Sequence, residues 1–268
     1  MHIRDVIYTK HDGVALTMDI IQPEKPNGFG IISIVSGGWI SNHDRIGSGE
    51  PFISRGYTVF YVVHGSQPRF TVEEIIADIN RSVRFIRSRA KEFGINPAKL
   101  GITGSSAGGH LSLMIATRGS VGDPAAKDTV DRESSAVQAA AVFYPPTDYL
   151  NWSGIGDTAV GIGKLASYAA AFGPNAAAPG GRLKTGINVS PIYGVKKTQP
   201  PIFIIHGDAD QSVPIFQAFR FQKRCEEAGA ICKVKVIPGA GHGGWPTMKD
   251  DSLLLVDWFD LYLRGLNK

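Results

Sequence analysis

The sequence predicts an α/β fold: a mostly parallel, doubly wound sheet with an antiparallel hairpin at its N-terminal edge and a small insertion or cap. Short apolar runs typical of buried strands alternate along the chain with longer segments of helical periodicity. Such alternation requires parallel crossover connections. In addition, one strand turns directly into a helix through Gly-Ser-Ser-Ala-Gly at residues 104–108.

The composition fits a single domain over residues 1–268. With 43% hydrophobic and 19% charged residues, a chain of 268 residues can bury a large core. The formal net charge is +4, and the basic residues between Arg81 and Lys91 recur at helical spacing without clustering with aromatic residues. That pattern is typical of a solvated helix face, so we expect no nucleic-acid partner.

We expect neither a membrane partner nor an export signal. No stretch approaches the roughly 18 apolar residues of a transmembrane helix. No apolar run follows the charges at the N-terminus, which predicts a cytoplasmic protein as given, or a secreted or periplasmic one if a signal was removed. Both reduced thiols and one local disulfide fit Cys225 and Cys232, and we favour the thiols.

The expected elements follow in order along the chain. Residues 3–8 and 15–20 alternate apolar and polar around a His-Asp-Gly turn at 11–13, which predicts an antiparallel hairpin. Residues 147–191 are rich in Gly and Ala with weak periodicity, and we interpret them as an insertion over the functional site. The remaining expected elements are strands at 30–35, 57–63, 99–103, 137–144, 201–205 and 232–237, and helices at 71–93, 214–228 and 251–263.

Ser106 is the predicted nucleophile. In a sharp turn from a strand into a helix, Cβ atoms at the flanking positions would clash, and Gly104 and Gly108 remove those atoms. The turn exposes the Ser106 hydroxyl above the sheet. It also places the Ala107 amide at the start of the helix, where it faces a developing oxyanion.

A serine hydroxyl needs a base held against it, and that base needs an orienting anion. Asp210 and His242 follow Ser106 in the chain order Ser, Asp, His, and each lies in a loop directly after a predicted strand. Asp208 is the alternative acid. Because Asp210 lies further beyond the strand end, we assign the acid to Asp210 and expect Asp208 to brace the loop.

The other histidines have simpler interpretations. His206 and His110 are expected to be structural hydrogen-bonding residues, and His64 is a weak candidate for the pocket lining. The chain has no histidine pair at metal-ligand spacing, and its cysteine pair lacks companions. We therefore expect no metal and no cofactor.

The strand at 30–35 opens into Ser36-Gly37-Gly38-Trp39, where bare backbone amides are available. A tetrahedral intermediate needs about two or three N–H donors, so Gly37, Gly38 and Ala107 are the candidates for an oxyanion hole. Trp39, Trp152 and Trp245 are candidates for an aromatic rim that holds a sugar or an aryl alcohol, with Trp39 and Trp245 as substrate-binding residues; each could equally be a packing residue.

Taken together, these motifs and Gly241-His242-Gly243 resemble the α/β-hydrolase serine esterases of the hormone-sensitive-lipase-like group, most closely the bacterial feruloyl and acetylxylan esterase type. The resemblance implies Ser106 as nucleophile, His242 as general base and acid, and Asp210 as its orienting carboxylate. It implies oxyanion donors at Gly37, Gly38 and Ala107. One departure is Val35-Ser36, where family members usually have His-Gly.

From these observations we expect a serine carboxylesterase for short-chain acyl esters, acting through an acyl-enzyme on acetyl or feruloyl esters of carbohydrate. A peptidase related to prolyl oligopeptidases, or a formamidase, is the alternative, although those peptidases usually have Tyr where this chain has Ala107. A catalytically dead binding protein is less favoured because no triad residue is missing. A monomer and a homodimer both remain open.

Overall fold

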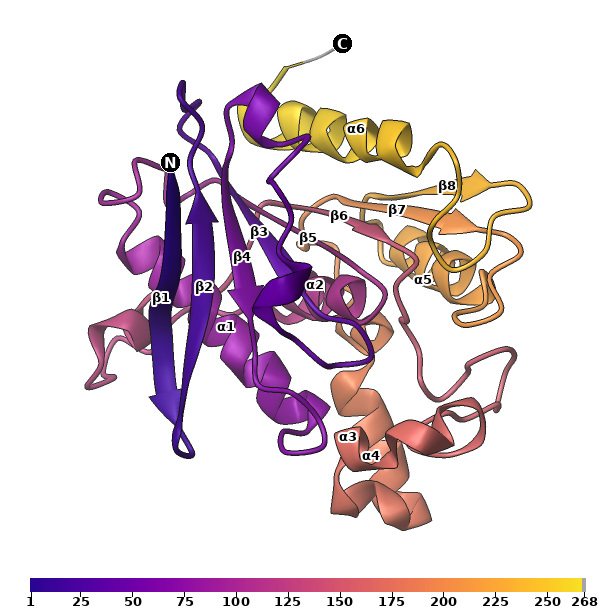
Figure 1. The fold of residues 1–268 in the computed structure, drawn as a ribbon. Helices are drawn as coiled ribbons and strands as arrows, with labels where there is room; N and C mark the ends of the chain where they lie inside the picture. The colour runs from indigo at the N-terminus through magenta and orange to yellow at the C-terminus, as the bar shows by residue number, and fades with distance from the viewer. Residues whose placement is uncertain (267–268) are drawn as a thin grey trace.

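The computed structural model describes residues 1–266, with an eight-stranded sheet at the centre (Figure 1). The strand order is β1-β2-β4-β3-β5-β6-β7-β8; the pairs β1/β2 and β2/β4 are antiparallel, and the others are parallel. The predicted sheet is therefore confirmed. The strands are β1 (His2–His11), β2 (Val14–Ile21), β3 (Gly30–Val35), β4 (Thr58–Val63), β5 (Leu100–Ser105), β6 (Ala139–Phe143), β7 (Ile202–Gly207) and β8 (Cys232–Ile237).

Helices cover both faces of this sheet. Figure 1 shows α1, α2 and α5 on one face and α6 on the other. The side chains of α1, α2 and α5 share one apolar cluster with the sheet, while α6 contributes to a second. The helices are α1 (Val72–Ser88), α2 (Ala107–Arg118), α3 (Ala169–Phe172), α4 (Pro179–Val189), α5 (Phe216–Glu227) and α6 (Met248–Phe259). The short 3₁₀ turns are η1 (His43–Arg45), η2 (Ile53–Arg55), η3 (Thr129–Arg132), η4 (Gly163–Tyr168), η5 (Pro174–Ala177) and η6 (Pro191–Gly194), and a π-helical turn, η7 (Asp260–Arg264), follows α6.

The central strands are apolar on both sides because both faces of the sheet are covered. All six residues of β4 are buried, and so are all residues of β3 except Ser33. The parallel register pairs Ile34 with Val62 on one side and with Gly104 on the other. The loops after β3 and β5 consequently emerge at the same edge of the sheet, next to each other.

The first long helix ends earlier than the periodicity predicts. The sequence predicts a helix over 71–93, whereas α1 ends at Ser88. The chain then turns, with the Ile95 amide donating to the Ala90 carbonyl at 3.0 Å. Ala90 and Phe93 are still buried, so the apolar spacing continues although the helix does not. At its other end α1 begins with a capping box between Thr71 and Glu74.

The insertion at 147–191 is built from short helices, among them η4, α3, η5 and α4, and it lies at one end of the sheet (Figure 1). Its aromatic side chains pack on the loop after β3: the rings of Tyr149, Tyr168 and Phe172 lie 5.9, 5.6 and 5.4 Å from that of Trp39. The insertion is therefore fixed to the domain through Trp39. Within residues 1–266, the helices are too short or too polar to cross a membrane.

Candidate active site

Ser106 lies at the sharp turn between β5 and α2. Its backbone has φ 53° and ψ −121°, a conformation that L-residues rarely adopt. A Cβ atom at Gly104 would lie 2.5 Å from the carbonyl carbon of Gly108, and one at Gly108 would lie 2.6 Å from the carbonyl oxygen of Ile34. Both glycines are thus required by close backbone approach, as the sequence predicts.

The structure brings Ser106, His242 and Asp210 together although they are far apart in the chain. His242 Nε2 lies 2.9 Å from Ser106 Oγ, and His242 Nδ1 lies 2.7 Å from Asp210 Oδ2. An ionised carboxylate can only accept, so Nδ1 carries the proton that it donates to Asp210. That leaves the Nε2 lone pair directed at the Ser106 hydroxyl, which is the arrangement of a general base.

Asp210 is held as an anion by the groups around it. Its side chain is fully buried, and its Oδ1 accepts from the amides of Ser212 and Val213 at 2.8 and 2.9 Å. Burial by itself raises the pKa of Asp210, but hydrogen bonds from His206, His242 and Val213 outweigh that effect and hold the pKa well below its usual range. The carboxylate is therefore ionised throughout the neutral range.

Asp208, the alternative acid, points elsewhere. Its Oδ1 accepts from the Gly239 amide at 2.6 Å and so ties the loop after β7 to the loop after β8. This is the bracing position expected from the sequence. Of the two aspartates, Asp210 is the one that contacts the His242 ring.

Two further residues lie near the His242–Asp210 pair: His206, which the sequence predicts to be a structural hydrogen-bonding residue, and Tyr144, which the sequence did not indicate. The fully buried His206 donates from Nε2 to the Val213 carbonyl at 2.8 Å, and the same atom lies 3.3 Å from Asp210 Oδ2. Tyr144, just after β6, packs its ring 4.5 Å from the His242 ring. A Cβ at Gly243 would meet the Tyr144 hydroxyl at 2.7 Å. Tyr144 could have been predicted to lie near Ser106, because it follows the carboxyl end of a strand next to β5.

The loop after β3 differs from expectation at Gly37. In this loop, which we call the β3 loop (residues 36–40), the Gly37 amide donates to the Ile40 carbonyl at 3.0 Å and the Ile40 amide donates back at 3.1 Å. The Gly37 N–H is already used, so the prediction that it serves as an oxyanion donor is corrected. Within the described residues, the amides of Gly38, Trp39 and Ala107 have no acceptor in the protein.

Gly38 and Trp39 both have positive φ values, 57° and 59°. This left-handed stretch turns two successive amides out of the β3 loop. The sequence did not indicate the Trp39 amide as a candidate, because only the two glycines of this loop are typical sources of bare amides. A Cβ at Gly38 would also lie 2.9 Å from Cε1 of Tyr168 in the insertion.

The predicted tryptophan rim is only partly formed. Trp39 and Trp152 line the cleft, but Trp245 is not among its lining residues. The Trp245 indole packs against Phe143 and Tyr144 and donates to Asp251 Oδ2 at 2.9 Å. The expectation that Trp245 binds substrate is therefore wrong, because its ring is committed to the core beneath α6.

The Trp39 side chain is almost fully buried. It is 3% exposed, and its Nε1 donates to His110 Nδ1 at 3.3 Å, consistent with the structural role expected for that histidine. His64 is buried too, and hydrogen-bonds the Gly65 carbonyl through Nδ1 at 2.6 Å. Trp39 thus offers very little ring surface to the cleft.

An open cleft of about 1010 Å³ surrounds the Ser106 hydroxyl. It is enclosed by the β3 loop, the turn between β5 and α2, the end of β6 and the η4 segment of the insertion. The lining includes Ser36, Gly37, Gly38, Trp39, Arg45, Glu50, Ser106, Ala107, Tyr144, Trp152, Lys164, Leu165, Tyr168 and His242.

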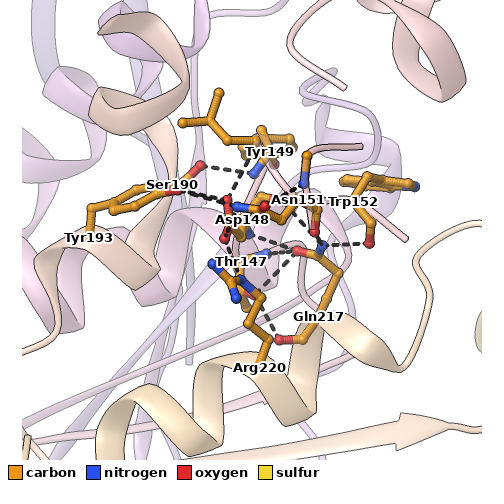
Figure 2. Close-up of polar contacts among 11 residues, drawn as sticks. Thr147, Asp148, Tyr149, Asn151, Trp152, Ser190, Tyr193, Gln217 and Arg220 are labelled. Carbon is orange, nitrogen blue, oxygen red and sulfur yellow. Dashed lines mark hydrogen bonds and ion pairs between the residues drawn. The ribbon is translucent and has the colours of Figure 1, made fainter. Parts of the chain in front are cut away.

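A buried glutamine of α5 supports the part of the insertion that lines this cleft (Figure 2). Gln217 Oε1 accepts from the amides of Thr147 and Asp148 at 2.8 and 2.7 Å. Its Nε2 donates to the carbonyls of Asn151 and Trp152 at 2.8 and 2.7 Å. Nε2 also donates to the Asp148 carbonyl at 3.2 Å, so one side chain contacts five backbone groups of the segment that carries Trp152.

The Asp148 carboxylate stabilises the same segment (Figure 2). It is fully buried and accepts from Arg220 Nε at 2.7 Å, Asn151 Nδ2 at 2.9 Å and the Tyr193 hydroxyl at 3.2 Å. A buried charge without such partners would be strongly destabilising.

A group of residues that could ligate a metal lies in a different hollow. One ligand atom each of Asp5, Asp19 and His43 lies within 4.8 Å of the others. His43 Nε2 is 3.3 Å from Asp5 Oδ1, and His2 Nε2 is 2.8 Å from Asp19 Oδ2. These side chains are already paired with one another, and none of them lines the cleft. The two cysteines, Cys225 and Cys232, are free and buried.

A comparison with protein families identifies the group. The family model BD-FAE matches residues 18–225, most of the chain. The chain belongs to the BD-FAE family. The match covers the β3 loop, Ser106 and Asp210, while His242 lies beyond it.

Several relatives of this BD-FAE protein are named as esterases. Esterase LipQ of Mycobacterium tuberculosis is 29% identical over 217 residues, which cover 79% of this chain and 49% of LipQ. An acetylxylan esterase of Xylanibacter ruminicola is 33% identical over 97 residues, covering 35% of this chain and 20% of that protein. The chain thus spans about half or less of the length of these curated relatives.

The solved structure of a truncated carbohydrate esterase from gut microbiota has a similar fold. It superposes with a TM-score of 0.80 at 25% identity and covers 97% of this chain and 96% of its own. The α/β-hydrolase fold implied by the sequence motifs is thereby confirmed over nearly the whole chain.

Proposed function

We propose that this protein is a serine carboxylesterase that works through an acyl-enzyme on Ser106. The observation that carries the proposal is the pair of contacts from His242, 2.9 Å to Ser106 Oγ and 2.7 Å to Asp210 Oδ2. A nucleophile, a base and an orienting anion at hydrogen-bonding distances are what a Ser-His-Asp hydrolase requires.

The reaction follows from the hydrogen bonds of these three residues. Ser106 Oγ attacks the ester carbonyl carbon while its proton passes to His242 Nε2, and Asp210 stabilises the imidazolium that forms. The tetrahedral intermediate collapses when His242 returns that proton to the alcohol oxygen, which leaves. Water then attacks the acyl group on Ser106 by the same route, releasing the acid and restoring the hydroxyl.

The oxyanion of each tetrahedral intermediate needs preorganised donors. We assign this role to the amides of Gly38, Trp39 and Ala107, which have no acceptor within the described residues. Ala107 is the first residue of α2, so its amide also carries the positive end of the helix dipole. Removing one such donor typically costs about 10²–10³-fold in kcat.

For the substrate we propose short acyl esters, in the first place acetyl or feruloyl esters of carbohydrate. The support is the open cleft of about 1010 Å³, which the half-buried Tyr168 borders, together with relatives named acetylxylan esterase and carbohydrate esterase. An accessible tyrosine ring suits the apolar face of a sugar or an aryl group. A monomer or a homodimer would serve equally, since the three residues come from one chain.

The test compares the parent protein with Ser106→Ala on 4-nitrophenyl acetate, butyrate and octanoate and on acetylated xylan. We expect acetate to be the fastest ester, xylan to release acetate, and the variant to be inactive and unlabelled by a fluorophosphonate. Equal rates for parent and variant would refute the assignment of Ser106. Faster turnover of octanoate would refute the short acyl preference, and hydrolysis of peptide anilides in place of esters would favour the peptidase alternative.

A further inference from the structure

Two cationic side chains line the cleft without an acidic partner. Arg45 of η1 and Lys164 of η4 are both exposed lining residues. Within residues 1–266, neither has a carboxylate oxygen within 4.0 Å. The acidic residue in the same lining is Glu50, whose Oε2 accepts from the Ser54 amide at 3.3 Å. The charge of these cations is therefore available to a ligand.

Arg45 is seated directly against the β3 loop. A Cβ at Gly37 would collide with Nη1 of the Arg45 guanidinium. Gly37 does not have a positive φ, and its amide is used by Ile40. The atoms that such a Cβ would meet are the end of an exposed side chain, so the contact shows where the guanidinium lies and does not by itself require glycine at residue 37. The Arg45 cation thus lies next to Gly37, one residue before the proposed oxyanion donor Gly38.

We propose that this protein prefers esters that carry a carboxylate close to the scissile bond, and that Arg45, assisted by Lys164, binds that carboxylate. The inference rests on the proposed esterase function and names its substrate class. A guanidinium presents a planar fork of donors that matches a carboxylate, while an ammonium acts as a movable point charge. Acetyl and feruloyl groups are themselves uncharged, so this preference adds a requirement that the carbohydrate ester proposal does not contain.

An Arg45 guanidinium that stabilised the oxyanion would instead accelerate neutral and charged esters alike. The structure favours substrate recognition because the Arg45 side chain is exposed and borders Gly37, whose amide points to Ile40. A solvated, flexible cation is a weak substitute for fixed amide donors, but it suits an ionised substrate that enters from water.

The carboxylate could belong to either half of the ester. If it belongs to the acyl group, the substrates are monoesters of dicarboxylic acids; if it belongs to the alcohol, they are acyl esters of hydroxy acids, acidic sugars among them. Two pairs of esters separate these sources. Monoethyl glutarate is compared with ethyl valerate for the acyl side, and 4-acetoxybenzoate with 4-acetoxybenzamide for the alcohol side.

The measurement is kcat/KM for all four esters with the parent protein, Arg45→Gln, Lys164→Gln and the surface control Lys91→Gln. We expect the charged member of one pair to be preferred, and the ratio of charged to neutral turnover to fall about 5- to 10-fold in Arg45→Gln, as loss of one partly screened charge pair implies. Lys164→Gln should lower the same ratio by less. Lys91→Gln should leave it unchanged, and the neutral esters should be turned over at parental rates by all variants.

Unchanged ratios in both pairs would overturn the proposal while leaving the esterase function intact. An equal loss on neutral and charged esters in Arg45→Gln would assign Arg45 to the oxyanion instead. The proposed function itself fails separately, if the parent protein turns over none of the four esters. Raising the salt concentration gives an independent readout, since a charge preference in an open cleft must weaken as screening increases.

Discussion

Gln217 Nε2 donates to the Trp152 carbonyl at 2.7 Å, so a side chain on α5 fixes the backbone of a residue in the cleft wall. The same amide group contacts Thr147, Asp148 and Asn151 and is fully buried. Without such contacts, the insertion would not be held in one position. Gln217 does so because its acceptor and donors match two amides and two carbonyls that would otherwise be buried without partners.

Replacing this amide should therefore loosen the insertion. Gln217→Leu leaves several buried backbone groups unpaired, at about 1–3 kcal/mol each before relaxation. We expect a clear fall in Tm and a rise in KM larger than the fall in kcat, because Trp152 moves while Ser106 and His242 do not. Lys223→Ala, an exposed position on α5, is the control and should change neither. Parental Tm and KM in Gln217→Leu would show that the network is dispensable.

Asp210 and Asp208 offer a comparison between two acids two residues apart. Asp210→Asn retains the side-chain volume but removes the anion that orients His242, and we expect kcat to fall by about 10⁴-fold. Asp208→Asn removes the anion that ties the loop after β7 to Gly239, and we expect a loss of less than about 10-fold. Steady-state kinetics on 4-nitrophenyl acetate decide between them. The reverse order of effects would move the acid to Asp208.

The relative positions of Ser106, Asp210 and His242 could be predicted because each follows a strand whose apolar run is plain in the sequence. The carboxyl ends of β5, β7 and β8 meet at one edge of the sheet, so the loops that follow them must lie close together. The details of the loops do not affect this closeness. It depends only on the parallel direction of the strands, which the alternation of strands and helices already implies.

The misplaced residues depend on contacts that no local pattern encodes. The Gly37 amide is lost as a donor because Ile40 turns back onto it. Trp245 leaves the cleft because Asp251 on α6 accepts from its indole. Arg45, which the sequence did not indicate, lies in the short turn η1, and its closeness to Gly37 arises from the path of the intervening loop. In each case one long-range or loop contact determines where the group lies. The periodicity of strands and helices does not predict such a contact.

Two buried histidines should make the protein sensitive to mild acid. Burial lowers the pKa of His64 and of His110 to about 4. In the unfolded chain the same rings bind a proton with a pKa near 6.5. The free energy of unfolding is therefore highest above about pH 6.5 and decreases as the pH falls from about 6.5 to 4. At pH 5 the loss should be about 2 kcal/mol for each ring.

Urea unfolding at pH 7 and pH 5 measures the expected decrease in the free energy of unfolding. Titration of the ring Cε1 protons by NMR assigns it, because both rings should remain neutral at pH 5.5 in the folded protein. If the His110 ring titrates near pH 6.5, its burial does not cause the acid sensitivity.

The contact between Gly38 and Tyr168 gives the sharpest test of the β3 loop. Gly38→Ala adds a Cβ that would lie 2.9 Å from Cε1 of Tyr168, at a residue with φ 57°. Because the loop must shift, the Gly38 and Trp39 amides move away from the oxyanion, and we expect kcat to fall by about 10²-fold with little change in KM. Gly94→Ala is the control: it has φ 66° and an open environment, so it should lower Tm slightly without affecting kcat.

Adding Tyr168→Ala to Gly38→Ala removes the steric conflict but not the backbone strain, and should restore part of the lost kcat. Full activity in Gly38→Ala would mean that the oxyanion is bound by other donors. If the double variant has the same kcat as Gly38→Ala, the loss is caused by backbone strain alone.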